Sequence, residues 1–174
     1  MQIALIPVGK VDSSMLESIG TAPTEEFDAS FSTQRPLAHP DYAFNPKREQ
    51  YLSDAILAQL SQLQIPADRI LGIVDLDLYT PDLNFVFGQA SMGGRVALIA
   101  LPRLRPEFYG DPPDQALFEE RTIKEAVHEL GHTVGLGHCP ERTCVMHFSN
   151  RLADTDFKGR SFCPRCGSRV RSMS

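Results

Sequence analysis

The segment from His128 to His138 carries residue types that can bind a metal ion and use it in hydrolysis. His128 and His132 are four residues apart, so in a helix both imidazoles lie on one face and can reach the same ion. Glu129 lies one step around that helix, near the ion but not needed to bind it. Gly135 lets the chain leave the helix through a left-handed turn, which can bring His138 back as a third ligand.

Three imidazoles around one ion predict a catalytic zinc site. Structural zinc sites fill all four positions with protein side chains, whereas catalytic sites keep one position for water or substrate. A water bound there has its pKa lowered to about 7, and Glu129 can take its proton as a general base. The alternatives are histidines that serve only as surface or capping groups, and a closed structural zinc site.

All four cysteines of the chain follow directly, as Cys139-x4-Cys144 and Cys163-x2-Cys166. Four thiolates leave no open position on zinc, so this set predicts a second, structural zinc. Residues 139–174 contain seven Arg or Lys against three Asp or Glu, a surplus that would offset the charge of the thiolates. Two disulfides are the alternative. A redox-active Cys163–Cys166 pair is less favoured, because the tail is expected to be irregular and to offer no helix start.

The elements that must position these residues alternate between strands and helices over the first 100 residues, which predicts an α/β sheet with crossover helices. Apolar patterns predict strands at residues 2–9, 27–31, 70–78, 84–90 and 95–101, with 27–31 half-buried and 84–90 at an edge. They also predict a helix at residues 47–63 and a long one from Asp111 to about Gly135. Beyond Gly135 the sequence has little periodicity, so metal and loops are expected to hold the tail.

Length and composition are those of one globular domain. The chain has 174 residues, of which 42% are hydrophobic and 22% charged. The formal net charge of −5 argues against a nucleic-acid binder, whose surface would be basic. No apolar run approaches the roughly 18 residues of a membrane span, and residues 1–9 lack the basic start of a secretory signal. We therefore expect a cytoplasmic protein, with a monomer favoured.

The zinc-binding pattern of residues 128–138, followed by Met146, resembles the metzincin signature, a zinc site with its Met-turn. The four cysteines that follow narrow the resemblance to the archaemetzincin family. Asp77-Leu78-Tyr79 and Asn84-Phe85-Val86-Phe87-Gly88 are similar to that family's segment ahead of the active-site helix. The resemblance covers nearly the whole chain and is densest from Ile123 to Cys166.

The resemblance implies an α/β fold with a metzincin-like mixed twisted sheet and an antiparallel edge strand. A long active-site helix and a zinc-stabilised irregular C-terminal subdomain complete that fold. It also implies a single catalytic domain over residues 1–174. Residues 1–137 would form its upper part, and residues 138–174 would hold the Met-turn and the four-cysteine site.

The resemblance also implies two Zn²⁺ per chain and a role for each candidate residue. Glu129 is then the general base and acid, and Met146 lies beneath the site. The catalytic zinc is bound by His128, His132 and His138, and the structural zinc by Cys139, Cys144, Cys163 and Cys166. Strand 84–90 lines the cleft, where an extended peptide can pair with it. Its candidate substrate-binding residues are Asn84, Phe85, Phe87 and Gly88.

The predicted function is therefore hydrolysis of peptide bonds by a zinc metallopeptidase, as an endopeptidase or an aminopeptidase. Its partner would be a peptide or protein substrate, with no nucleic acid and no membrane. Some metzincins place a tyrosine two residues after the Met-turn methionine, where this chain has Phe148 and so no hydroxyl. This departure keeps an alternative open, a zinc-stabilised peptide-binding protein with little or no hydrolytic activity.

Overall fold

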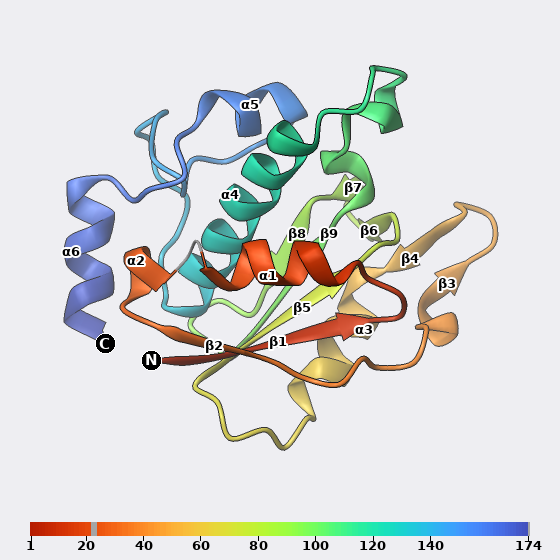
Figure 1. Ribbon diagram of the computed structural model, residues 1–174, viewed down its shortest axis with the longest axis horizontal. Helices are drawn as coiled ribbons and strands as arrows, with labels where there is room; N and C mark the ends of the chain where they lie inside the picture. Colours follow the sequence, from red (N-terminus) through yellow and green to blue (C-terminus); the bar gives the residue numbers. More distant parts are fainter. Residues whose placement is uncertain (22–23, 174) are drawn as a thin grey trace.

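The computed structural model describes residues 1–21 and 24–173 and centres on a five-stranded sheet (Figure 1). The strand order is β2-β1-β5-β9-β8. The bounds are β1 (Gln2–Val8), β2 (Ser30–Thr33), β5 (Arg69–Val74), β8 (Gly88–Ala90) and β9 (Val96–Ala100). The first four strands of that order run parallel, and β8 pairs antiparallel with β9 at the edge. The expected mixed sheet with an antiparallel edge strand is confirmed.

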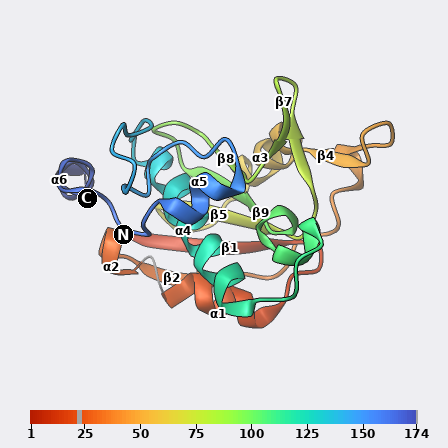
Figure 2. The same ribbon diagram turned by 90° about the horizontal axis from the view of Figure 1, so that it is seen from above.

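Helices cover both faces of this sheet (Figures 1 and 2). Because side chains alternate along a strand, neighbouring residues of β1 enter different clusters. Ile3 and Leu5 pack with α1 (Ser13–Thr21) and α4 (Gln115–Thr133). Ala4 and Ile6 pack with α3 (Ser53–Ser61) on the other face. The α4 helix, which carries the candidate site, is thus held against the sheet by one of the two cores.

Two of the expected strands are each found as two shorter strands, one in the first sheet and one in a second, four-stranded sheet. The second sheet contains β3 (Phe44–Asn45), β4 (Gln50–Leu52), β6 (Leu78–Thr80) and β7 (Leu83–Val86). The expected strand 70–78 is β5 followed by β6, and the expected strand 84–90 is β7 followed by β8. Asp75 and Asp77 lie between β5 and β6 and pair with Arg105 (2.6 Å) and Arg103 (2.5 Å). These ion pairs lie where the chain passes from the first sheet to the second.

The two expected helices begin later than their apolar patterns indicate. The first starts at Ser53, because residues 44–52 form a hairpin whose turn holds Glu49 at φ 55°, a left-handed value. The second starts at Gln115 rather than Asp111. Its N-cap is Asp114, whose carboxylate accepts the Leu117 N–H at 3.0 Å.

The tail contains more regular structure than expected. It forms α5 (Leu152–Phe157) and α6 (Pro164–Met173). Proline is well suited to the first position of a helix, so Pro164 starts α6 directly after Cys163. The Cys163–Cys166 pair therefore lies at a helix start, contrary to the sequence expectation. Short helices complete the described chain, namely α2 (Thr24–Phe27), η1 (Asp41–Ala43), η2 (Pro102–Leu104) and η3 (Pro106–Tyr109).

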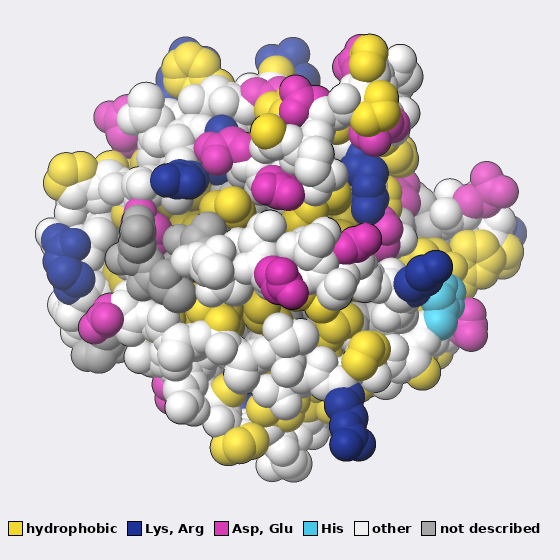
Figure 3. All heavy atoms as spheres, in the orientation of Figure 1, with side chains coloured by type: hydrophobic (Ala, Val, Ile, Leu, Met, Phe, Trp, Pro, Cys, Tyr) yellow, Lys and Arg dark blue, Asp and Glu magenta, His cyan; other side chains and the backbone are white. Residues whose placement is uncertain are grey.

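Two features bear on partners. Within residues 1–21 and 24–173, no helix combines the length and the apolar character of a membrane span. On the face shown in Figure 3, Lys and Arg side chains lie scattered among acidic, apolar and uncharged ones. The described residues therefore form no continuous basic surface on that face.

Candidate active site

The structure brings the three candidate histidines together. His128 and His132 lie on one face of α4, and the helix ends before Gly135, whose φ of 79° is left-handed. The turn that follows returns the chain, so that one ring nitrogen from each of His128, His132 and His138 lies within 4.8 Å of the others. The glycine thus places His138 as the sequence predicts.

The hydrogen bonds of the histidines fit a bound zinc ion. Nδ1 of His128 donates to the carbonyl of Val145, and Nδ1 of His132 to that of Leu136, both at 2.7 Å. In a neutral ring the other nitrogen, Nε2, then carries a lone pair, and these two Nε2 atoms face each other at 3.1 Å. Facing lone pairs repel unless a cation lies between them. Tetrahedral zinc with bonds of about 2.0–2.1 Å places its nitrogen ligands about 3.3–3.4 Å apart.

Desolvation favours the neutral, metal-binding form of all three rings, including the His138 ring, whose residue is exposed. Desolvation lowers the pKa of His128 well below its ordinary value, and the positive charge of Lys158 lowers it further. Desolvation is also the main cause that lowers the pKa of His132 and of His138. Since a protonated imidazole cannot coordinate, these shifts favour metal binding.

Glu129 belongs to α4, and its side chain lies next to β8 in the wall of a cleft. Burial is the main cause that raises the pKa of its carboxyl, and the charge of Glu125 raises it further, whereas Lys158 lowers it. A Cβ atom at Gly88 would lie 2.6 Å from Cγ and 2.8 Å from Oε1 of Glu129. Glycine at this position therefore lets β8 pass close to the carboxylate. Within the described chain this carboxylate has no hydrogen bond and no ion pair.

Met146 forms the floor beneath α4. Its side chain is fully buried, and a Cβ atom on Gly131 would overlap its Sδ. The Cys139 N–H donates to the Met146 carbonyl at 2.9 Å, which closes the turn between them. The glycine between His128 and His132 is therefore needed for close packing of the helix on the thioether, a role that the sequence analysis did not assign.

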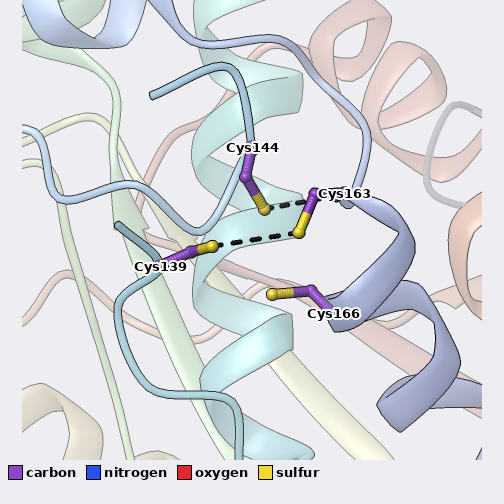
Figure 4. Close-up of side chains that lie close together, drawn as sticks. All are labelled: Cys139, Cys144, Cys163 and Cys166. Carbon is purple, nitrogen blue, oxygen red and sulfur yellow. Dashed lines mark hydrogen bonds between the residues drawn. The ribbon is translucent and has the colours of Figure 1, made fainter. Parts of the chain in front are cut away.

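The four cysteines also converge (Figure 4). Their sulfurs lie within 4.8 Å of one another, with Cys139 and Cys144 on the segment after α4 and Cys163 and Cys166 at the start of α6. The Cys139–Cys163 sulfur separation is 3.8 Å, and tetrahedral zinc with bonds of about 2.3 Å requires about 3.8 Å. All four thiols are free. This geometry fits a four-thiolate zinc site and does not contain the alternative disulfides.

The charge around the sulfurs also suits a bound cation and its thiolates. The backbone N–H of Cys166 is the main cause that lowers the pKa of Cys163 to about 7. Arg165 donates to the Cys139 sulfur at 3.5 Å, as the basic surplus of the tail suggested. Burial instead raises the pKa of Cys144 and of Cys166. A zinc ion would offset that cost by coordinating the deprotonated sulfurs.

A cleft of about 420 Å³ adjoins the histidines and Glu129. The four candidate substrate residues Asn84, Phe85, Phe87 and Gly88 all line it, although Asn84 and Phe85 lie in β7, Gly88 lies in β8 and Phe87 lies between these strands. Phe87 is only 5% exposed and also packs in the core. Phe148 lines the cleft as well, and its ring lies 4.8 Å from that of His138. Its exposed ring thus contacts a candidate ligand but offers no hydroxyl.

The sequence analysis missed two buried charged residues beside the site, Glu125 and Lys158. Lys158 follows α5, and its Nζ lies 3.0 Å from Oε1 of Glu125 on α4. One signal was available for Glu125, because it precedes Glu129 by four residues and so shares its helix face. No sequence pattern links Lys158 to α4.

Comparisons with known proteins agree on the family. Residues 36–172 match the family model described as "Peptidase family M54". The chain is 43% identical over 172 residues to an archaemetzincin of Pyrococcus furiosus, covering 94% of this chain and 89% of the relative. The crystal structure of an archaemetzincin from Methanopyrus kandleri superposes with a TM-score of 0.88 at 39% identity, covering 99% of this chain and 94% of that one.

A third similar protein is described as zinc-dependent. The structure of a zinc-dependent peptidase from Methanocorpusculum labreanum has a TM-score of 0.87 at 30% identity and covers 97% of this chain and 99% of that one. The family match, the relatives and the two convergent ligand sets agree with the resemblance noted in the sequence. The chain belongs to peptidase family M54, the archaemetzincin family of zinc metallopeptidases.

Proposed function

We propose that this chain hydrolyses peptide bonds in the cleft beside α4, with His128, His132 and His138 as ligands of a catalytic zinc. The observation that carries the proposal is the pair of facing Nε2 atoms, 3.1 Å apart, next to a Glu129 carboxylate that has no partner in the described chain. A cation site and a free base side by side are the two parts that metal-assisted hydrolysis needs.

Glu129 is proposed to act first as base and then as acid. A zinc ion in the site would polarise the scissile carbonyl and make a water molecule more acidic. The Glu129 carboxylate takes a proton from the attacking water and later gives it to the leaving amine. Burial raises the pKa of Glu129, which favours its acting as a proton donor as well as an acceptor.

The edge strand β8 is proposed to bind the substrate in extended form. The Ala100 N–H bonds the Phe87 carbonyl (2.8 Å), and the Ser91 N–H bonds the Val96 carbonyl (2.9 Å). Because bonded residues alternate in an antiparallel pair, the backbone groups of Gly88 and Ala90 point away from β9. A peptide can pair with them. Apolar side chains of the substrate would contact Phe85 and Phe87, with Asn84 at the rim of the cleft.

The four cysteines are proposed to hold a second, structural zinc, so that each chain carries two zinc ions. The 3.8 Å separation of the Cys139 and Cys163 sulfurs supports this. Met146 is proposed to support α4 from below as the Met-turn residue. Elemental analysis of the protein as isolated tests the count. A single zinc with the cysteines paired as disulfides would contradict it.

The proposal is tested with zinc-loaded protein and a diverse library of quenched-fluorescent peptides. Glu129→Gln is expected to lower kcat by about 10²–10⁴-fold, because it removes the base, while both zinc ions are retained. Unchanged turnover in Glu129→Gln would remove Glu129 from the mechanism. Binding without cleavage of any peptide would instead favour the peptide-binding alternative, which the family membership does not favour.

Three further expectations stay proposals. Residues 1–174 are proposed to form one catalytic domain, with the cysteine site in its second part, residues 138–174. Four clustered free thiols support a cytoplasmic location, since reducing compartments keep thiols reduced. Cell fractionation tests that location, and light scattering tests the expected monomer.

A further inference from the structure

A buried ion pair lies beside the candidate catalytic residues, and its carboxylate residue Glu125 lines the same cleft. The Lys158 side chain is fully buried, and its Nζ lies 3.0 Å from Oε1 of Glu125, which is itself 4% exposed. The buried Thr155 hydroxyl donates to the same carboxylate oxygen at 3.2 Å. The pair joins the end of α5 to the middle of α4, two elements that lie side by side in Figures 1 and 2.

Two carboxylates on α4 compete for this single ammonium group. Glu125 and Glu129 are four residues apart, so both project from one face of the helix. The Lys158 charge acts on Glu129, since it lowers the pKa of that carboxyl. Yet the ammonium bonds Glu125, and the described chain gives Glu129 no partner.

The other neighbour of Lys158 cannot hold it. Its Nζ lies 3.4 Å from Nδ1 of His128, but that nitrogen donates its proton to the Val145 carbonyl at 2.7 Å. Two donors do not bond each other. Glu125 is therefore the side-chain acceptor that keeps the ammonium in place.

We propose that Glu125 is a positioning residue for the reaction. By binding Lys158, it keeps the ammonium from pairing with Glu129 and leaves both oxygens of the base free to face the cleft. The reason is the cost of an unpaired buried charge, which drives a buried ammonium to the nearest carboxylate. This role rests on the proposed function of Glu129 as the base.

The direct test is a crystal structure of zinc-loaded Glu125→Gln. This substitution keeps the shape of the side chain and its bond to Thr155 but removes the charge that holds Lys158. The expected result is an ion pair between Lys158 and Glu129. An ammonium that stays beside residue 125, with Glu129 unpaired, would overturn the proposal. This experiment needs no turnover. The Lys158 partner can therefore contradict this proposal while peptide cleavage supports the proposed function, and it can support this proposal while cleavage is absent.

Kinetics on the library peptide that the parent protein cleaves fastest give the second readout. Glu125→Gln is expected to lower kcat by about 10–100-fold, in the range found when supporting residues of a metal site are removed. Glu125→Asp should retain most of kcat, because it keeps the carboxylate although it shortens the side chain. A packing role predicts the reverse order, since glutamine is the better match in shape, and that order would contradict the proposal.

Two controls separate charge placement from stability. Lys158→Met in the Glu125→Gln chain should restore kcat to within about tenfold of the parent, because no ammonium then competes for Glu129. If Glu125→Gln alone does not fold, this paired variant carries the test, and a folded but inactive paired variant overturns the proposal. Glu119→Gln removes a carboxylate of the same helix whose hydrogen-bond partner is Gln115, and it should leave kcat and zinc affinity unchanged.

Discussion

Replacing Cys163 by serine should weaken zinc binding at the three histidines, although Cys163 belongs to the other ligand set. The path runs through Cys144, whose sulfur shares the cysteine cluster. The next residue, Val145, supplies the carbonyl that orients His128 at 2.7 Å. The cluster also anchors Cys139, which directly follows His138. Loosening the cluster should therefore disturb two of the three candidate ligands.

The expected size follows from the bond between His128 and Val145. A hydrogen bond to a charged group contributes about 1.5–3 kcal/mol, and a zinc-bound imidazole is such a donor. Losing most of that contribution corresponds to a decrease in zinc affinity of about 10–100-fold, the usual range for groups that support a metal ligand.

The assay is competitive chelation of the more labile zinc in the parent protein and in Cys163→Ser. Circular dichroism and the melting temperature check that both are folded. Ser168→Ala, at an exposed position on α6, is the matched control and should bind zinc as the parent does. Equal zinc affinities in folded parent and Cys163→Ser proteins would show that the two sites are independent and that the cysteines only stabilise the tail.

Three other substitutions test the packing and charge of the site. Gly131→Ala should lower the free energy of unfolding by about 1–3 kcal/mol, because its Cβ would overlap the Met146 sulfur, whereas Gly137→Ala, with open space around it, should not. Urea unfolding measures both. Gly88→Ala should lower kcat, because the added Cβ atom would collide with the Glu129 side chain and displace its carboxylate. Zinc affinity should stay within about threefold of the parent, because the Cβ atom would not meet a candidate zinc ligand. In metal-free protein, Glu129→Gln should stabilise the fold at pH 8 and progressively less towards pH 5. The folded-state pKa of Glu129 is raised above its ordinary 4.5, so ionisation of the buried carboxyl costs stability as the pH rises. A gain that is constant with pH would contradict this.

Local patterns predicted the parts of the molecule that depend on local spacing. The four-residue spacing of His128 and His132, the turn at Gly135 and the two cysteine pairs all lie within short segments, and the structure brings each set together. The edge position of residues 84–90 was also expected from their alternating pattern, whereas the antiparallel direction was expected from the resemblance, and β8 shows both. These features need no knowledge of distant contacts.

Distant contacts decided what the sequence did not predict. Residues 70–78 read as one apolar strand, but the strand divides where Arg103 and Arg105 bind Asp77 and Asp75. The α5 helix packs on α4 through polar groups, such as the ion pair between Arg121 and Asp156 at 2.6 Å, which an apolar pattern cannot show. Lys158 was missed for the same reason, because its partner lies 33 positions earlier in the chain.

The place of β1 in the central sheet has a consequence for how the chain folds. β1 pairs in parallel with β5, so Ile3 lies opposite Arg69, and β5 in turn pairs with β9 at residues 96–100. Contacts so far apart in sequence close slowly, because the entropy of the intervening loop is lost before they form. During synthesis the apolar segment 2–8 must therefore wait, unpaired on one side, until about 70 further residues have emerged. We expect this pairing to limit the rate of refolding. We also expect nascent chains that end before β5 to be the most prone to aggregate.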